Sequence, residues 1–328
     1  MPPRLLAGIG CGLALSVLLA GRSATIPAGP AADATGRTTI PADLARRAAF
    51  AEETMRRAED VIRTAKQRDR IESEAEAGID RSGLIGSEVT PLMTTLGSLE
   101  AKRISTNPAW ARVLTERLSA VGVGRGDLVT ASFSGSFPGL DLAVACACKA
   151  LGADLAAVSS VTASTWGATQ PGFTWPEMEA RLVDAGVISR ASIAVTAGGE
   201  ADMALDLEPD GRAMAWQTLE HSARHLGVPT LRPRDFADAV RQRMDAYRRI
   251  ANGRPVKLYV NVGGASASLG RSSEILRLRS GFIPPGPFDR SVDRGVTARM
   301  AEQGVRVLML LNIRDLALGW GVPLTGRQ

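Results

Sequence analysis

The chain has 328 residues, of which 45% are hydrophobic and 22% charged, a composition that supports a sizeable globular core. Its 39 basic and 34 acidic side chains leave a net charge of +5, a mild bias towards anionic partners. Only 4% of the residues are aromatic, and neither a zinc-finger spacing nor a basic block with interleaved aromatic residues occurs. We therefore expect no nucleic acid among the partners.

The first segment of the chain is an uncharged apolar run at residues 5–20, directly after Arg4. As a helix this run would be about 24 Å long, slightly less than a hydrocarbon core, so it fits a signal-peptide core or a short membrane anchor. The cleavage pattern around Ala24 is poorly formed, which favours an uncleaved anchor. We predict a membrane anchor or signal segment at residues 1–21 and a flexible linker at residues 22–42.

The next segment, residues 43–80, is predicted to be a helical stalk. Residues 44–76 contain eight basic and eight acidic side chains, as in a solvated helix with many i,i+4 ion pairs. Its apolar stripe could contact a partner protein, but it could also pack on the chain's own domain. The stripe consists of Met55, Ala58, Ile62 and Ala65.

Residues 81–328 alternate between strand and helix patterns, which predicts an α/β domain with a mainly parallel sheet flanked by helices. Strands are expected at residues 127–133, 154–159, 192–196, 257–262 and 305–310. Helices are expected at residues 108–121, 139–151, 175–185, 213–226, 234–250 and 292–303. In such a sheet ligands bind beyond the carboxyl ends of the strands.

The loop Ser134, Gly135, Ser136 lies between the first strand and a buried helix, and is therefore a candidate site at a helix N-terminus. It could bind a carboxylate or phosphate, supply a nucleophilic hydroxyl, or merely cap the helix. It is not a Gly-x-Ser-x-Gly elbow, and no general base can be identified beside it from the sequence.

Three further polar segments could converge with this loop at the same sheet edge. Gly263 and Gly264 follow a strand in a loop without the Gly-Lys-Ser/Thr ending of a P-loop, and Ser164 lies in a hydroxyl-rich segment after another strand. The polar segment at residues 90–108, which includes Glu100 and Lys102, is predicted to be a constrained loop. All these residues are predicted ligand-binding candidates.

No metal site and no cofactor are predicted. His221 and His225 are four residues apart on an expected helix, but the sequence offers them no third ligand. Cys146 and Cys148 lie two apart in the buried helix and point in different directions, so they are expected to be core residues.

Six segments together resemble the bacterial poly-gamma-glutamate system protein family. They are GLIGSEVTPLMTTLGSLEAKRISTNP, SFSGSFPGLDLAVACACKALGAD, SSVTASTWGAT, FTWPEME, NVGGASASLG and LLNIRDLALGWGVPL. The resemblance implies a role in poly-gamma-glutamate synthesis, export or handling at the cell envelope, beside the other membrane components of that system. It supplies no catalytic residues.

Three functions follow as expectations. The first is a membrane-anchored accessory protein, with its main domain outside the cytoplasm, that binds or guides poly-gamma-glutamate. The alternative is a hydrolase or transferase that uses Ser134, Ser136 or Ser164 on a gamma-amide bond, and this alternative lacks an evident base. The second alternative is a structural partner of the synthase complex that contacts membrane proteins through residues 44–76.

Overall fold

The computed structural model describes residues 40–71, 81–271, 280–287 and 294–326, which belong to one compact unit, Ile40–Gln328. The predicted anchor at residues 1–21 and nearly all of the predicted linker lie outside the described residues. Among the described helices, none is both long and apolar enough to cross a membrane.

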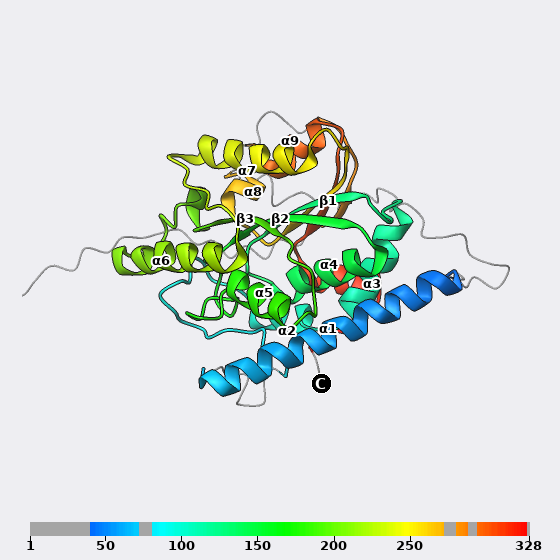
Figure 1. The fold of residues 1–328 in the computed structure, drawn as a ribbon, viewed down its shortest axis with the longest axis horizontal. Coiled ribbons are helices and arrows are strands. Elements are labelled where there is room, and N and C mark those ends of the chain that lie inside the picture. Colours follow the sequence, from blue (N-terminus) through cyan, green and yellow to red (C-terminus); the bar gives the residue numbers. More distant parts are fainter. Residues whose placement is uncertain (1–39, 72–80, 272–279, 288–293, 327–328) are drawn as a thin grey trace, which may run out of the picture. The chain divides into compact units, whose positions relative to one another are not determined.

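A six-stranded sheet forms the centre of this unit (Figure 1), in the order β3-β2-β1-β4-β6-β5. The strands are β1 Leu128–Phe133, β2 Asp154–Ser160, β3 Ser192–Thr196, β4 Val256–Val262, β5 Gly281–Ile283 and β6 Arg306–Leu310. Pairing is parallel except between β5 and β6. The predicted α/β class with a mainly parallel sheet is therefore confirmed.

The helices flank this sheet. They are α1 Ala42–Asp69, α2 Leu99–Ser105, α3 Ala109–Ala120, α4 Pro138–Leu151, α5 Trp175–Asp184, α6 Pro209–Leu226, α7 Phe236–Ala251, α8 Ser266–Leu269, α9 Val296–Glu302 and α10 Ile313–Trp320, with a 3-10 turn at Glu200–Asp202. Prediction located α3 to α7 and α9, but it missed the short helices α2, α8 and α10. In α2 and α8, charged or small residues interrupt the apolar pattern that would indicate a helix.

Successive side chains along each strand point to opposite faces of the sheet, and each face is covered by its own apolar layer. Val129, Ala131 and Phe133 of β1 pack in one cluster with α1, α3, α4 and α5, whereas Tyr259 of β4 packs in another with α7 and α9. Figure 1 shows α7 and α9 on the opposite side of the strands from α3 and α4. Because successive strand residues face opposite sides, each strand contributes to both layers.

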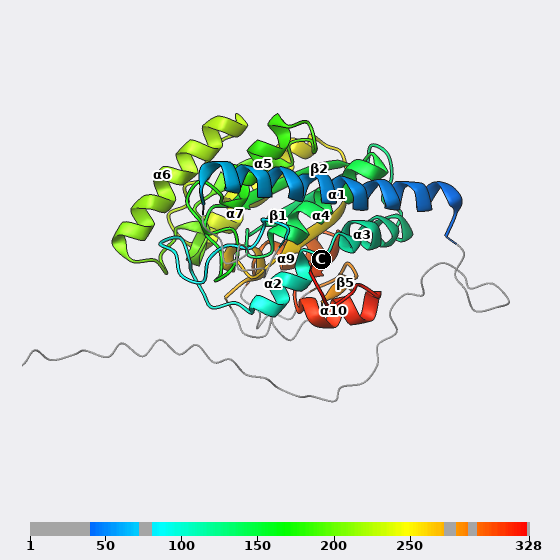
Figure 2. The ribbon, with the colours of Figure 1, turned by 90° about the horizontal axis from the view of Figure 1, so that it is seen from below.

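Helix α1 occupies most of the region predicted as a stalk, and it is part of the same compact unit. Its stripe, which includes Met55 and Ile62, is buried in one cluster with residues of α3 and α4. Figure 2 shows α1 lying alongside these two helices. Burial of this stripe removes apolar surface from water, so α1 is a wall of the α/β domain. Of the two alternatives for the stripe, the structure shows packing on the chain's own domain.

The strand order creates a crevice between β1 and β4. From β1 the chain enters α4 in one helical layer, and from β4 it enters α8, which contacts α7 and α9 in the other layer. Loops that diverge in this way leave a gap at the carboxyl ends of adjacent strands, where ligands bind in open α/β sheets.

Candidate functional site

A pocket of about 300 Å³ lies at this strand edge and is lined mainly by hydroxyl groups and glycines. The hydroxyl groups come from several loops and belong to Thr94, Thr95, Ser134, Ser136, Thr162, Ser164 and Ser266. Phe137, the residue that precedes α4, and Gly264, which follows β4, also line it. The helix N-terminus and the two loops at the crevice therefore contribute to one cavity.

The conformation of the β1–α4 loop is stabilised by local contacts. Gly135 adopts φ +67°, a conformation that favours glycine, and the Ser134 hydroxyl accepts a hydrogen bond of 3.2 Å from the Ser136 N–H. The Ser136 hydroxyl in turn accepts a 3.2 Å hydrogen bond from the N–H of Ser164. This contact joins the loops after β1 and β2.

The β4 loop approaches the same serines closely. Gly263 has φ +83°, and a Cβ atom there would lie only 2.1 Å from Ser134 Oγ. Gly264 and Ala265 face the pocket, and among the described residues no acceptor binds their N–H groups. These two N–H groups are therefore available to a ligand atom.

Lys102 lies beneath the pocket floor and joins the two serine loops. It belongs to α2, which begins after Ser98, and only 1% of the residue is exposed. Its Nζ donates a hydrogen bond of 2.7 Å to Ser164 Oγ and another to the carbonyl oxygen of Ser136, and it lies 4.2 Å from the centre of the Phe137 ring. The amine is not itself part of the pocket lining.

Burial lowers the pKa of Lys102 to about 7, and the negative charge of Asp141 only partly opposes that shift. Asp141 lies in the first turns of α4 and is fully buried, and neither of its oxygens makes a regular hydrogen bond with a described residue. Burial raises the pKa of this carboxyl well above its usual range, against the effects of the Gly135 N–H and Lys102. The lowered pKa brings deprotonation of the Lys102 amine towards neutral pH.

A backbone segment before α2 holds Lys102 and Ser164 together. Thr94 donates its N–H to the Ala163 carbonyl, and Thr165 donates its N–H to the Thr95 carbonyl, both at 2.8 Å. At Gly97 a Cβ atom would lie 3.1 Å from Ser164 Oγ and 3.2 Å from Lys102 Cε. The absence of a side chain at Gly97 allows this close contact between the amine and the hydroxyl.

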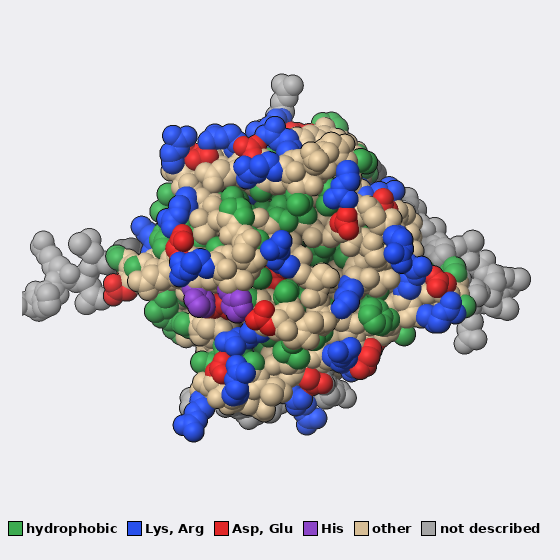
Figure 3. All heavy atoms as spheres, viewed as in Figure 1, with side chains coloured by type: hydrophobic (Ala, Val, Ile, Leu, Met, Phe, Trp, Pro, Cys, Tyr) green, Lys and Arg blue, Asp and Glu red, His purple; other side chains and the backbone are tan. Residues whose placement is uncertain are grey.

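The loops after β1 and β2 and the loop after β4 form two walls of the pocket. A third wall contains Gly199, Glu200 and Asp206. Glu200 forms a 2.6 Å ion pair with Arg271, and its N–H donates to Asp206 at 3.0 Å. Glu200 and Asp206 carry the charges among the described lining residues. On the face in Figure 3, Lys and Arg side chains are dispersed among acidic ones instead of forming one basic patch.

The structure brings together most of the predicted site residues. Ser134, Ser136, Ser164 and Gly264 line the pocket, while Lys102, Gly135 and Gly263 contact those residues from behind. Glu100 lies elsewhere: its side chain is 59% exposed and pairs with Arg314.

The general base could not be identified from the sequence. In the structure the amine of Lys102 contacts the Ser164 hydroxyl, and Lys102 lies on a helix in a segment that was predicted as a loop. Ser98 followed by a run without Gly or Pro is an N-cap signal that could have indicated α2.

No protein-family model, curated protein or solved structure matches this chain, so the chemistry of the pocket is interpreted from its own geometry.

Proposed function

We propose that this protein is a serine hydrolase or acyltransferase in which Lys102 activates Ser164 for attack on an amide or ester carbonyl. The observation that carries the proposal is the 2.7 Å contact between Lys102 Nζ and Ser164 Oγ, with the amine buried and its pKa near 7. A general base is most effective when its pKa lies near the working pH. A lysine that served only to bind carboxylates would face the pocket directly.

The reaction begins with the neutral form of Lys102. Ser164 Oγ attacks the carbonyl carbon while its proton moves to Lys102 Nζ, and collapse of the tetrahedral intermediate returns that proton to the leaving amine or alcohol. A water molecule or a second nucleophile then attacks the acyl-Ser164 ester and loses its proton to Lys102. The ester bond breaks, and Lys102 returns that proton to Ser164 Oγ. Hydrolysis and acyl transfer differ only in the molecule that takes the acyl group from Ser164, which is water in the first case and another nucleophile in the second.

Two features suit the negative charge that develops on the carbonyl oxygen. The N-terminus of α4 opens into the pocket at Phe137 and carries a partial positive charge. The N–H groups of Gly264 and Ala265, which bond to no acceptor in the described part of the chain, lie on the loop after β4. Backbone donors of this kind are the usual components of an oxyanion hole.

Poly-gamma-glutamate is the first substrate to test, because the sequence resemblance suggests it and its gamma-amide bonds suit the proposed chemistry. An anchor at residues 1–21 would place the site at a membrane surface. The acidic residues Glu200 and Asp206 in the lining would repel the carboxylates of this polymer, so they count against its tight retention in the pocket. Polymer binding without cleavage, the accessory role expected from the sequence, is the competing outcome.

A fluorophosphonate probe tests the proposed nucleophile directly, since it reacts preferentially with activated serines. We expect mass spectrometry to locate the adduct on Ser164 at pH 8, Ser164→Ala to abolish it, and Lys102→Met to slow its formation strongly. Ser119→Ala on α3, outside the pocket, is the matched control and should react like the wild type. An unmodified Ser164 in the folded protein would contradict the proposal.

Substrate identity is tested separately by incubating the protein with poly-gamma-glutamate and following chain length. Shortening that requires Ser164 supports the polymer as substrate. Adduct formation without shortening retains the serine chemistry but excludes this substrate. Retention of the polymer by a protein that forms no adduct supports the accessory role instead.

A further inference from the structure

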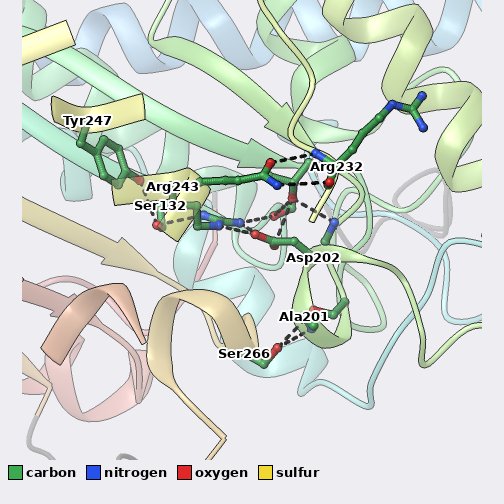
Figure 4. A network of polar contacts seen from close by, with 12 residues as sticks. Ser132, Ala201, Asp202, Arg232, Arg243, Tyr247 and Ser266 are labelled. Atoms are coloured by element: carbon green, nitrogen blue, oxygen red, sulfur yellow. Dashed lines mark hydrogen bonds and ion pairs between the residues drawn. The ribbon is translucent and has the colours of Figure 1, made fainter. Parts of the chain in front are cut away.

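A second buried cation, Arg243, lies between α7 and the sheet, next to Asp202 and Ser132 (Figure 4). It projects from α7, and its guanidinium contacts Asp202 through Nε at 2.5 Å and Nη2 at 2.8 Å. The two side chains are 0% and 1% exposed. Such bidentate pairs fix the orientation of both partners.

Arg243 also joins the ends of adjacent strands. Its Nη1 donates to Ser132 of β1 at 3.0 Å and its Nη2 to Ser160 of β2 at 3.3 Å, while Thr196 of β3 donates its hydroxyl to Asp202 at 3.1 Å. Each of these strand residues lies two or three positions before a residue that lines the pocket. Those lining residues are Ser134, Thr162 and Gly199.

Asp202 belongs to a segment with unusual backbone conformations. Ala201, Asp202 and Ala204 have φ values of +56°, +60° and +52°, although none of them is glycine. Such left-handed conformations cost free energy for residues with a Cβ atom and persist only where the surroundings enforce them. Enforcement here comes from Arg243 on one side and from Ser266, whose hydroxyl accepts a 2.8 Å hydrogen bond from the Ala201 N–H, on the other.

We propose that Asp202 and Arg243 are positioning residues that hold the segment of residues 198–206 in its strained form as the third wall of the pocket. The segment supplies Gly199, Glu200 and Asp206 to the lining of the pocket that Ser164 also lines. Fixing this wall sets how tightly a substrate is held and leaves proton transfer between Ser164 and Lys102 unchanged. The inference rests on the proposed function for its kinetic consequence but not for its structural one.

The test replaces the pair with neutral side chains of similar shape, Asp202→Asn with Arg243→Gln, so that no buried charge remains uncompensated. Amide exchange within residues 198–206 should become at least about tenfold faster, because local opening no longer breaks an ion pair. With a small ester such as 4-nitrophenyl acetate, KM should rise about tenfold while kcat changes less than about threefold. The control is Asp245→Asn with Arg248→Gln, which neutralises an exposed pair on the same helix.

Arg243→Lys is the second variant in case the double substitution prevents folding. It retains the charge but cannot contact Asp202, Ser132 and Ser160 together, so a smaller change in the same direction is expected. Unchanged exchange at residues 198–206 in a folded variant would overturn the positioning role. Faster exchange with kcat reduced and KM unchanged would overturn the assignment to substrate binding. If the wild type cleaves no ester and forms no adduct at Ser164, the proposed function fails, whereas amide exchange still decides the positioning role.

Discussion

Lys102 and Arg243 are both long cationic side chains buried almost completely in one domain, but their partners differ. Arg243 has a bidentate carboxylate partner in Asp202, whereas Lys102 contacts a hydroxyl and a carbonyl oxygen. Burial lowers the pKa of Arg243, but the charge and hydrogen bonds of Asp202 outweigh burial and raise it above the usual value. Burial dominates at Lys102 and lowers its pKa to about 7.

This difference in partners suits Arg243 to a structural role and Lys102 to a role in proton transfer. An ion whose charge is matched by a buried partner stays ionised and stabilises a fixed arrangement. A buried amine without a hydrogen-bonded carboxylate is close to losing its proton, which is the property that a general base requires. Removal of the Arg243 charge should therefore mainly reduce stability, whereas removal of the Lys102 amine should mainly reduce labelling of Ser164.

The largest effect is expected from Arg243→Met. It leaves Asp202 buried without its partner, so the free energy of unfolding should fall by about 3–5 kcal/mol. Urea unfolding followed by circular dichroism measures this loss. A fall of less than about 1 kcal/mol, the range of exposed ion pairs, would mean that the pair stabilises little.

Lys102→Met should have the opposite balance of effects. Fluorophosphonate labelling and any ester hydrolysis should slow by about 10²–10⁴-fold, because the general base is lost. Stability should not fall, since a buried polar amine is replaced by an apolar side chain of similar length. Labelling at the wild-type rate would remove Lys102 from the mechanism.

The pH dependence of the free energy of unfolding should differ between the wild type and Lys102→Met. The folded pKa of Lys102, about 7, lies below its usual value of 10.5, so the unfolded chain binds more protons between these values. Stability of the wild type should therefore rise with pH across this window, by on the order of a few kcal/mol relative to Lys102→Met. Parallel curves for the two proteins would show that the amine has an ordinary pKa.

A smaller effect is expected where the β4 loop meets the serine loop. Gly263→Ala places a methyl group 2.1 Å from Ser134 Oγ at a positive φ, so it should cost about 1–3 kcal/mol. Gly264→Ala is the matched control for stability, because its methyl group would meet only Leu269 Cδ1 at 3.8 Å. Equal melting temperatures for the two variants would contradict the close packing of the two loops.

The smallest effect is expected from Glu100→Gln, two residues from Lys102. Glu100 is exposed and pairs with Arg314 at the surface, so stability should change by less than about 1 kcal/mol. Labelling of Ser164 should be unchanged. A labelling rate that falls as far as in Lys102→Met would place Glu100 in the site after all.

The main strands and the meeting of the serine and glycine loops could be predicted from the sequence, because apolar runs and the edge rule for parallel sheets are local or general. The burial of Lys102 could not be predicted from the sequence. It depends on α2 packing beneath Ser164, which is 62 residues away along the chain. Likewise α7 has several arginines, and only the direction in which its face meets the sheet determines that Arg243 is buried.

The pKa of the Lys102 amine is the property that most directly decides whether Lys102 can act as the base for Ser164. The chain contains only four lysines, Lys66, Lys102, Lys149 and Lys257, so a protein labelled with ¹³C at lysine Cε should give an NMR spectrum simple enough to assign. The signal that disappears in Lys102→Met should titrate with a midpoint near pH 7. A midpoint above pH 10 for that signal would contradict the central claim that Lys102 is a general base for Ser164.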